Sequence, residues 1–300
     1  MQDILVEKPY EFIPPHRGRW LPTVIRDLNL HAIWLRRFEG VVDFELRGQQ
    51  HLVASLQQGH GILLAPNHCR LSDPLVLGWL ARDIGCLVYA MASWHLFEQS
   101  WLMRWAIHKM GGFSVYREGI DRQAINVAIE ILESAERPLI IFPEGAVSRT
   151  NDHLQALLDG VAFIARTAAK RRAKKVAGGK VVVHCVAIKY LFQGDFDAAA
   201  DSVLTEIEKR LTWEPKAELP TDQRIAQVGL ALLSLKEMEI LGRTYDGSLK
   251  ERLDRLINTL LAPIEQQWLG EVSGGAVVPR VKTLRMKIMP DMVHGRVGQE

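Results

Sequence analysis

The stretch GILLAPNHCRLSDPLVLGWLARD, from Gly61 to Asp83, joins a strand pattern, a polar turn and a helix pattern. Its first residues are mainly apolar and end at a proline, which is typical of a short buried strand. Asp73 and Pro74 then favour a helix start, because aspartate caps the first turn and proline fits its first position. The stretch therefore predicts a strand, a turn and a helix in succession, the basic unit of an α/β sheet.

The same alternation continues on both sides of this unit, up to about residue 200. The predicted strands lie at 41–48, 61–66, 86–91, 113–117, 138–145 and 180–190. Helix patterns separate most of them, at 73–83, 94–109, 121–135 and 154–169. Strands separated by helices predict an α/β fold with a mostly parallel sheet flanked by helices.

Two flanking regions differ from this pattern, so we expect three parts in the chain. Residues 1–40 are an N-terminal amphipathic helical segment, residues 41–200 the domain that carries the chemistry, and residues 201–300 an α-helical C-terminal extension. In the extension, a capping box at 248–251 precedes an apolar stripe of helical spacing, and 281–289 predicts a final edge strand. No internal repeat is apparent on inspection of the sequence.

Composition and charge narrow the function classes. Lys and Arg number 37 against 35 for Asp and Glu, a formal net charge of +2, which argues against a dedicated nucleic-acid-binding protein. The 3 cysteines are odd in number and far apart, so they predict neither a disulfide framework nor a zinc site, and a reducing cytoplasm fits them. We expect no secretory signal and no membrane-spanning helix, so a protein of this kind that acts on lipids meets the membrane from one side.

The first candidate for chemistry is the turn at the carboxyl end of the 61–66 strand, where α/β sheets usually bind ligands. This turn holds His68 and then Asp73. A turn of this length can bring the carboxylate back to the imidazole, fix one tautomer and leave the other nitrogen free as a general base. The alternative, from these residues alone, is a helix-capping aspartate beside an incidental loop histidine.

Two further strand ends carry polar groups. The strand at 138–145 ends in the sequence FPEG, a turn whose backbone N–H groups, with Arg149 nearby, suit a phosphate or another anion. The alternative is an ordinary turn in which glycine supplies a positive φ. The short strand from Gly112 delivers Arg117 at its end, and arginine suits bidentate phosphate binding. For an isolated arginine, a surface salt bridge is the commoner use.

In order and spacing, these three blocks resemble the glycerolipid acyltransferase family, which includes 1-acylglycerol-3-phosphate and glycerol-3-phosphate acyltransferases. The family pattern is an NHxxxxD block, a later glycine-to-arginine strand block and an FPEG block, and the resemblance covers about residues 40–192. The positions that match it are Asn67, His68, Asp73, Gly112, Arg117, Phe142, Pro143, Glu144 and Gly145. The resemblance therefore implies an acyltransferase of phospholipid biosynthesis, similar to a 1-acylglycerol-3-phosphate O-acyltransferase.

The resemblance also implies a role for each block. His68 is the expected catalytic base and Asp73 its catalytic partner, which orients it, while Arg117 is expected to bind the acceptor phosphate. The substrate-binding residues expected on this basis are Asn67, Gly112, Arg117, Glu144, Gly145 and Arg149. No covalent acyl-enzyme, metal or cofactor is expected, and acyl-CoA or acyl-carrier protein is the expected co-substrate.

One departure from the family pattern bears on the acceptor. The family usually continues FPEG with Thr-Arg-Ser, whereas this chain continues with Ala146, Val147 and Ser148, and its next arginine is Arg149. Lysophosphatidate is the leading acceptor, and another single-chain lysolipid is the alternative within the same class. Two other readings of the residues are a catalytically silent protein that binds a membrane surface and a thioesterase in which water replaces the lipid hydroxyl.

The expected partners are the acyl donor, a lysolipid and a membrane surface, with no nucleic acid, and the expected location is the cytoplasm, peripherally on the inner face of a membrane. Trp94, Trp101 and Trp105 share one face of the predicted 94–109 helix, and we expect them to pack into the core rather than enter a membrane interface. The basic run at 170–180 is expected to be a solvated loop, with anionic lipid or the phosphates of coenzyme A as alternative contacts.

Overall fold

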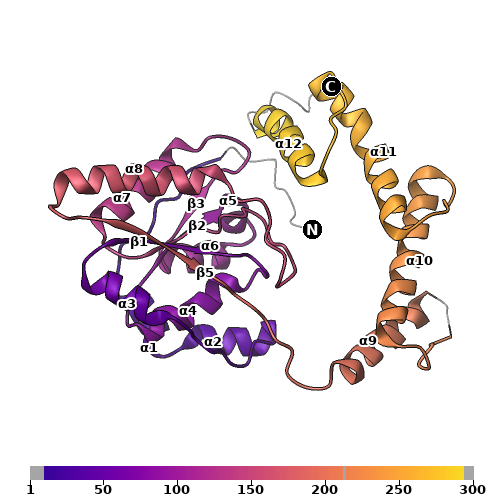
Figure 1. Cartoon of the computed structure of the whole chain (residues 1–300), viewed down its shortest axis with the longest axis horizontal. Helices are drawn as coiled ribbons and strands as arrows, with labels where there is room; N and C mark the ends of the chain where they lie inside the picture. The colour runs from indigo at the N-terminus through magenta and orange to yellow at the C-terminus, as the bar shows by residue number, and fades with distance from the viewer. Residues whose placement is uncertain (1–9, 212–213, 294–300) are drawn as a thin grey trace. The chain divides into compact units, whose positions relative to one another are not determined.

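The computed structural model describes residues 10–211 and 214–293, which form two compact units. Among the described residues, the first unit comprises 10–190 and 292–293, and the second comprises 191–211 and 214–291 (Figure 1). All the residues predicted to do chemistry lie in the first unit. The division into three parts at residues 40 and 200 stays a prediction.

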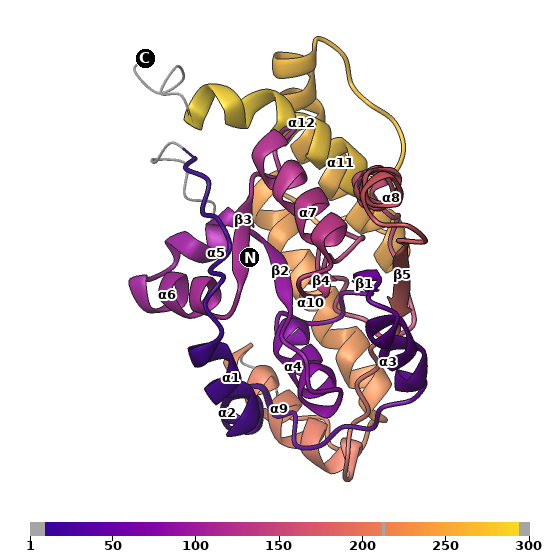
Figure 2. The same ribbon diagram turned by 90° about the vertical axis from the view of Figure 1, so that its left-hand side faces the viewer.

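The first unit is built on a five-stranded sheet in the order β3-β2-β4-β1-β5, and every neighbouring pair in it is parallel. The strands are β1 (Gly61–Pro66), β2 (Tyr89–Ser93), β3 (Gly112–Val115), β4 (Leu139–Ile140) and β5 (Val181–Val186). Figure 2 shows them in this order across the sheet. The predicted α/β fold with a parallel sheet is therefore confirmed.

Helices cover both faces of this sheet, which explains why the inner strand β1 is mainly apolar. On one face, Leu63 packs in a cluster with residues of α7 (Arg122–Ser134) and α8 (Asp159–Lys175). On the other face, Ile62 and Leu64 pack against α3 (Gln49–Gln57) and α4 (Asp73–Asp83). Figure 1 shows the two helix pairs on opposite sides of the strands.

The turn between β1 and α4 differs in one detail from the expectation. Ser72, not Asp73, is the residue that precedes the helix, and Asp73 is its first residue, followed by Pro74. Instead of capping the first turn, the Asp73 carboxylate accepts a hydrogen bond from the backbone N–H of Arg70 at 3.0 Å. The side chain is thus turned back toward the loop that carries His68.

The N-terminal part of this unit is helical, as predicted, but the strand predicted at 41–48 is absent. The helices are α1 (Trp20–Asp27), α2 (Leu30–Trp34) and the π-helix η1 (Leu35–Glu39). Residues 41–48 belong to neither a strand nor a helix. Val41 and Phe44 pack on Trp79 of α4 instead, with the Phe44 and Trp79 rings stacked 4.7 Å apart. The apolar pattern of this segment is satisfied by a helix surface rather than by strand pairing.

The predicted helix at 94–109 is two helices, α5 (Trp94–Glu98) and α6 (Trp101–Lys109). The break occurs because Ser100 caps α6 by accepting a hydrogen bond from the backbone N–H of Met103. Of the three tryptophans, only Trp94 is buried; Trp101 is 79% exposed and Trp105 is 45% exposed. The expectation that all three pack into the core is therefore wrong for the two on α6.

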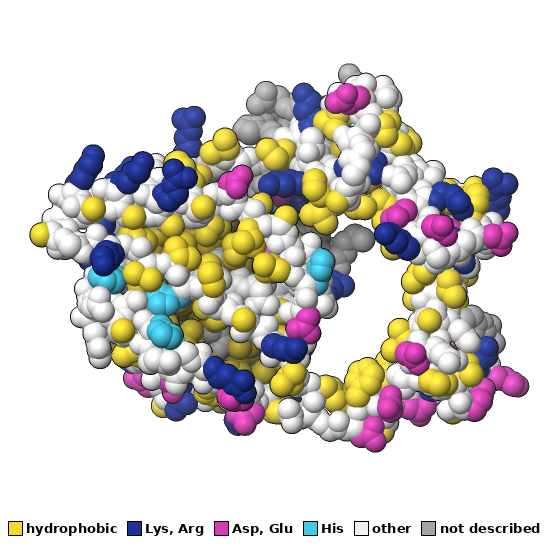
Figure 3. All heavy atoms as spheres, viewed as in Figure 1, with side chains coloured by type: hydrophobic (Ala, Val, Ile, Leu, Met, Phe, Trp, Pro, Cys, Tyr) yellow, Lys and Arg dark blue, Asp and Glu magenta, His cyan; other side chains and the backbone are white. Residues whose placement is uncertain are grey.

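The basic run at 170–180 also differs from the prediction of a loop. Its first part is the end of α8, which continues to Lys175. Arg172 of this run is buried and donates to the backbone oxygens of Glu133 and Gly59, while its neighbours Lys170, Arg171, Lys174 and Lys175 are exposed. Figure 3 shows Lys and Arg side chains along α8.

The second unit is helical, as predicted, with the exception of its end. Its helices are α9 (Phe196–Arg210), α10 (Thr221–Leu241), α11 (Leu249–Leu269) and α12 (Val277–Val293). The final strand predicted at 281–289 is wrong, because this segment lies inside α12, where Leu284 and Met289 are buried. The predicted capping box is present, with Ser248 and Glu251 bonded to each other's backbone N–H groups.

The consecutive helices of this unit are joined by the same buried ion pair at each junction. Each pair is bidentate, with two nitrogens of an arginine near the start of one helix bonded to both carboxylate oxygens of a glutamate near the end of the helix before it. The pairs are Glu208–Arg224, Glu237–Arg252 and Glu265–Arg280. The three arginines are equally spaced along the chain.

Apolar positions follow the same spacing, which shows that the unit contains an internal repeat. Val228, Leu256 and Leu284 are equally spaced in the sequence, and each is buried. Gly242 and Gly270 end α10 and α11 with φ values of 72° and 81°, a backbone conformation that glycine adopts freely. The absence of a repeat expected from inspection of the sequence is therefore wrong.

Candidate active site

Three loops meet at the carboxyl ends of the neighbouring strands β4, β1 and β5. The loop after β1 carries His68, the loop after β4 carries the sequence FPEG at 142–145, and the segment after β5 ends at Tyr190. Because all three strands are parallel, their carboxyl ends lie at one edge of the sheet. The topology thus brings together segments that are far apart in the sequence.

His68 and Asp73 form the centre of this cluster. The Nδ1 atom of His68 lies 2.8 Å from Oδ2 of Asp73, whose side chain is fully buried, while 15% of the His68 side chain is exposed. The Phe142 ring stacks on the imidazole at 4.0 Å. With a proton on Nδ1 that is donated to Asp73, the Nε2 atom carries a lone pair and can act as a base.

Tyr190 is a member of this cluster that the sequence analysis missed. Its hydroxyl donates to Oδ1 of Asp73 at 2.5 Å. Burial, together with this bond to a carboxylate, raises the pKa of Tyr190 above its ordinary value. The residue ends a strong strand pattern, and nothing in that pattern distinguishes its hydroxyl from that of any other strand tyrosine.

Asn67 holds the loop after β1 to the segment after β5. Its side-chain oxygen accepts from the backbone N–H of Ile188 at 2.6 Å, and its amide nitrogen donates to the Ile188 carbonyl at 3.0 Å. The Asn67 amide also contacts the Sγ atom of Cys69 at 3.0 Å. Burial raises the pKa of the Cys69 thiol, so this cysteine is poorly suited to be a nucleophile.

Glu144 links the loops after β1 and β4. It is buried, and its two oxygens accept hydrogen bonds from the backbone N–H of His68 at 2.8 Å and of Gln155 at 2.9 Å. Both oxygens are therefore used to hold backbone, which places Glu144 behind the His68 loop as a support. The carbonyl of His68 is held in turn by Ser148, whose backbone N–H donates to it at 2.7 Å.

Gly145 closes the FPEG turn, and its N–H is not free for an anion. This N–H donates to the carbonyl of Phe142 at 3.1 Å. The residue has a φ of 66°, and a Cβ atom at this position would lie 2.6 Å from Cδ1 of Leu158, so both backbone conformation and space require glycine. The expectation of free N–H groups in this turn is thus wrong for Gly145.

Arg117 and Arg149 are the exposed cations at this turn. The Arg117 guanidinium donates to the carbonyl of Gly145, and Arg149 follows Ser148, which is bonded to the His68 carbonyl. Both arginines therefore lie on loops that are bonded directly to the His68 cluster. Arginine is well suited to bind a phosphate there, because its planar guanidinium matches the phosphate oxygens.

Gly112 is the one predicted site residue that the structure does not bring to this cluster. It is the first residue of β3 and pairs with Ala90, which lies level with Ile140 of β4 in the middle of the sheet. A Cβ atom on Gly112 would lie 2.4 Å from Cγ2 of Ile107. The glycine thus permits close packing of α6 on β3, and its place in the fold is structural.

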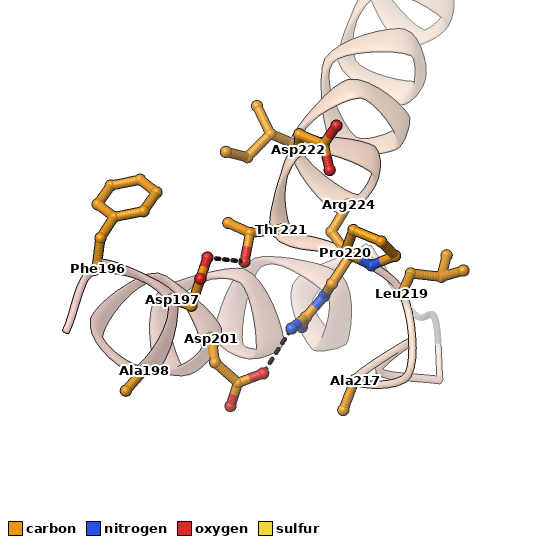
Figure 4. Close-up of a pocket in the computed structure, with 11 residues that line it drawn as sticks. Phe196, Asp197, Ala198, Asp201, Ala217, Leu219, Pro220, Thr221, Asp222 and Arg224 are labelled. Atoms are coloured by element: carbon orange, nitrogen blue, oxygen red, sulfur yellow. Dashed lines mark hydrogen bonds and ion pairs between the residues drawn. The ribbon is translucent and has the colours of Figure 1, made fainter.

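Two pockets are lined by residues outside this cluster. One, of about 680 Å³, lies at the junction of α9 and α10, where Asp197 bonds with Thr221 and Asp201 pairs with Arg224 (Figure 4). The other, of about 420 Å³, lies near the amino ends of β1 and β2. Among the described residues, no group of three His, Cys, Asp or Glu side chains is arranged to hold a metal ion.

A comparison with known proteins covers the segment that carries this cluster. Residues 43–189 match the sequence model of a family described as Acyltransferase. The matched segment contains β1 to β5 and all the residues predicted to do chemistry. No solved structure matches the chain significantly. The match identifies residues 43–189 as a segment of the Acyltransferase family.

Proposed function

We propose that the chain transfers a fatty acyl group from a thioester donor, acyl-CoA or acyl-carrier protein, to a hydroxyl of a glycerolipid precursor. The observation that carries this proposal is the contact of 2.8 Å between His68 and the fully buried Asp73 at the carboxyl edge of the sheet. A buried carboxylate on Nδ1 favours the imidazolium that forms when Nε2 accepts a proton. The arrangement is therefore suited to deprotonate a hydroxyl.

In the proposed reaction, Nε2 of His68 takes the proton of the acceptor hydroxyl as the acceptor oxygen attacks the thioester carbonyl. The new C–O ester bond forms, the C–S bond breaks, and the leaving thiolate takes the proton back from His68. Atoms and charge balance without a covalent acyl-enzyme, a metal or a cofactor. Asp73 keeps the imidazole oriented throughout the reaction.

Arg117 and Arg149 support an acceptor that carries a phosphate. Both are exposed, and both lie on loops bonded to the His68 cluster. The Glu144 and Gly145 turn and Asn67 hold these loops in place and so position the acceptor indirectly. Lysophosphatidate is the acceptor that fits two cations beside a base, and Val147 leaves one fewer cation there than the family pattern has.

Exposed apolar side chains support the proposal that the protein binds a membrane surface. The proposed location is the inner face of the cytoplasmic membrane, to which the protein binds peripherally. Trp20 is 77% exposed and Phe38 is 62% exposed, and the intervening segment includes the exposed cations Arg36 and Arg37. Aromatic side chains beside cations suit a headgroup region with anionic lipids. In the described part of the chain, no helix is both long and apolar enough to cross a bilayer.

Product identity tests the proposed function. The native chain is incubated with mixed acyl-CoA donors, or with acyl-carrier protein donors, and a panel of lysolipids, and the lipids are read by mass spectrometry. We expect a diacyl product, with lysophosphatidate preferred. Free fatty acid without acylated lipid would show a thioesterase instead, and no turnover with either donor would show a silent binding protein.

A further inference from the structure

Both carboxylate oxygens of Asp73 have hydrogen-bond partners. Oδ2 accepts from the backbone N–H of Arg70 at 3.0 Å and contacts Nδ1 of His68 at 2.8 Å. Oδ1 accepts from the Tyr190 hydroxyl at 2.5 Å. We propose that Tyr190 is a positioning residue of the acyl-transfer site, whose hydroxyl fixes the carboxylate in the orientation that aims His68; this inference rests on the proposed function.

Both the backbone and the ring of Tyr190 are held by neighbouring loops. The side chain of Asn151, in the loop after β4, accepts from the Tyr190 backbone N–H at 2.9 Å and donates to the Tyr190 carbonyl at 2.7 Å. The guanidinium of Arg70, in the loop after β1, lies 4.9 Å from the centre of the Tyr190 ring. All three loops at this edge of the sheet thus contribute to the placement of one hydroxyl.

In the hydrogen bond between Tyr190 and Asp73, the hydroxyl is the donor and the carboxylate is the acceptor. Because burial and the nearby carboxylate raise the pKa of Tyr190, the hydroxyl keeps its proton at neutral pH and donates it to Asp73. Without this bond, Oδ1 of a fully buried carboxylate would lose its partner, and the carboxylate would be free to rotate away from His68.

Tyr190 also lies at a boundary of the chain. It is the residue that follows the segment matched by the family, 43–189, and the last residue of the first unit before Leu191. The third side chain of the His68 and Asp73 arrangement therefore lies outside the matched segment, which explains why the three sequence blocks do not include it.

The test compares Tyr190→Phe with Tyr89→Phe, a matched control. Tyr89 is buried and, like the half-buried Tyr190, donates its hydroxyl to a carboxylate, that of Glu136 at 2.8 Å. It begins β2, away from the carboxyl edge of the sheet. We expect Tyr190→Phe to lower kcat about ten- to a hundred-fold with KM little changed, since a bond to a charged group is lost. Tyr89→Phe is expected to keep the native kcat.

The pH profile separates positioning from packing. A carboxylate that has turned away from Nδ1 stabilises the imidazolium less, so the acid limb of the kcat/KM profile of Tyr190→Phe is expected to move to lower pH. Unchanged kcat and an unchanged acid limb in Tyr190→Phe, or equal changes in Tyr89→Phe, would overturn the inference. Should Tyr190→Phe fail to fold, Asn151→Ala, which releases the Tyr190 backbone, is expected to show the same two changes to a smaller extent, and their absence would overturn it.

A second measurement does not depend on activity. The Nδ1 proton of His68 is observed by NMR in histidine-labelled protein, and its resonance is assigned by its loss in His68→Ala. We expect it to shift or broaden in Tyr190→Phe and not in Tyr89→Phe. If the native chain transfers no acyl group but the resonance changes in Tyr190→Phe, the proposed function is refuted and the positioning of His68 by Tyr190 still stands. If the native chain transfers acyl groups but the resonance does not change in Tyr190→Phe, the proposed function stands and the inference is refuted.

Discussion

Replacing Asp73 with asparagine tests the electrostatic part of the mechanism separately from its geometry. The backbone N–H of Arg70 donates to Oδ2, so the amide side chain in Asp73→Asn must place its oxygen, not its NH2 group, at that position. His68 then still has an acceptor for its Nδ1 proton, and the Tyr190 hydroxyl can accept from the NH2 group. The tautomer is expected to stay the same, and only the negative charge is lost.

The magnitude follows from this geometry. A hydrogen bond to a charged group stabilises by about 1.5–3 kcal/mol and one between neutral groups by about 1 kcal/mol, so the loss is about 0.5–2 kcal/mol, or roughly 2- to 30-fold in kcat. Asp73→Ala removes every acceptor, so we expect it to approach the loss of the base itself, about a hundred- to ten-thousand-fold.

Thiol release with acyl-CoA as donor measures these rates, and thermal unfolding checks that both variants fold. The reasoning predicts that Asp73→Asn is much more active than Asp73→Ala. Equal rates for the two variants would refute it, because the amide would then fail to preserve the tautomer. A native rate in Asp73→Asn would show that the charge of Asp73 contributes nothing to the transition state.

Three further outcomes are expected. Arg117→Met raises KM for a lysolipid with a terminal phosphate about tenfold, measured against a lysolipid without one, for which KM should not change. Arg252→Met lowers the thermal unfolding temperature by several degrees at neutral pH, whereas Lys236→Met, which breaks an exposed pair, lowers it little. Arg252 holds the pKa of Glu237 below its ordinary value, so the loss of unfolding temperature in Arg252→Met is present at neutral pH and shrinks as the pH falls through that lowered pKa. Thermal unfolding scans at several pH values measure this. Trp20→Ala weakens sedimentation with anionic liposomes about threefold or more, and an unchanged bound fraction would contradict this.

The sequence predicted the parts of the site that depend on local pattern. A short apolar strand, a turn and a proline-marked helix start placed His68 at a strand end, and parallel pairing of β1 with β4 and β5 brought the FPEG turn beside it. Gly112 illustrates the limit of prediction from a motif. A shared motif position identifies the residue but does not say whether it packs against a neighbouring element or binds substrate. Its contact with Ile107 could be found only from the structure.

The missed features depend on contacts between residues that are distant in sequence. Tyr190 reaches Asp73 across the sheet edge, and no local pattern encodes that contact. Residues 41–48 have an alternating pattern, but Phe44 stacks on Trp79, so the pattern reports burial against a helix rather than strand pairing. The repeat in the second unit lies in sparse positions, such as Arg224 and Arg252, which inspection for similar segments does not detect.

The most direct test of the central claim is the rate of acyl transfer by His68→Ala, with His60→Ala as the matched control at the opposite end of β1. Removal of a general base predicts a fall in kcat of about a hundred- to ten-thousand-fold for His68→Ala and a native rate for His60→Ala, with both variants folded. A native rate in His68→Ala would contradict the assignment of the base. An equal fall in both variants would show that the loss is not specific to His68.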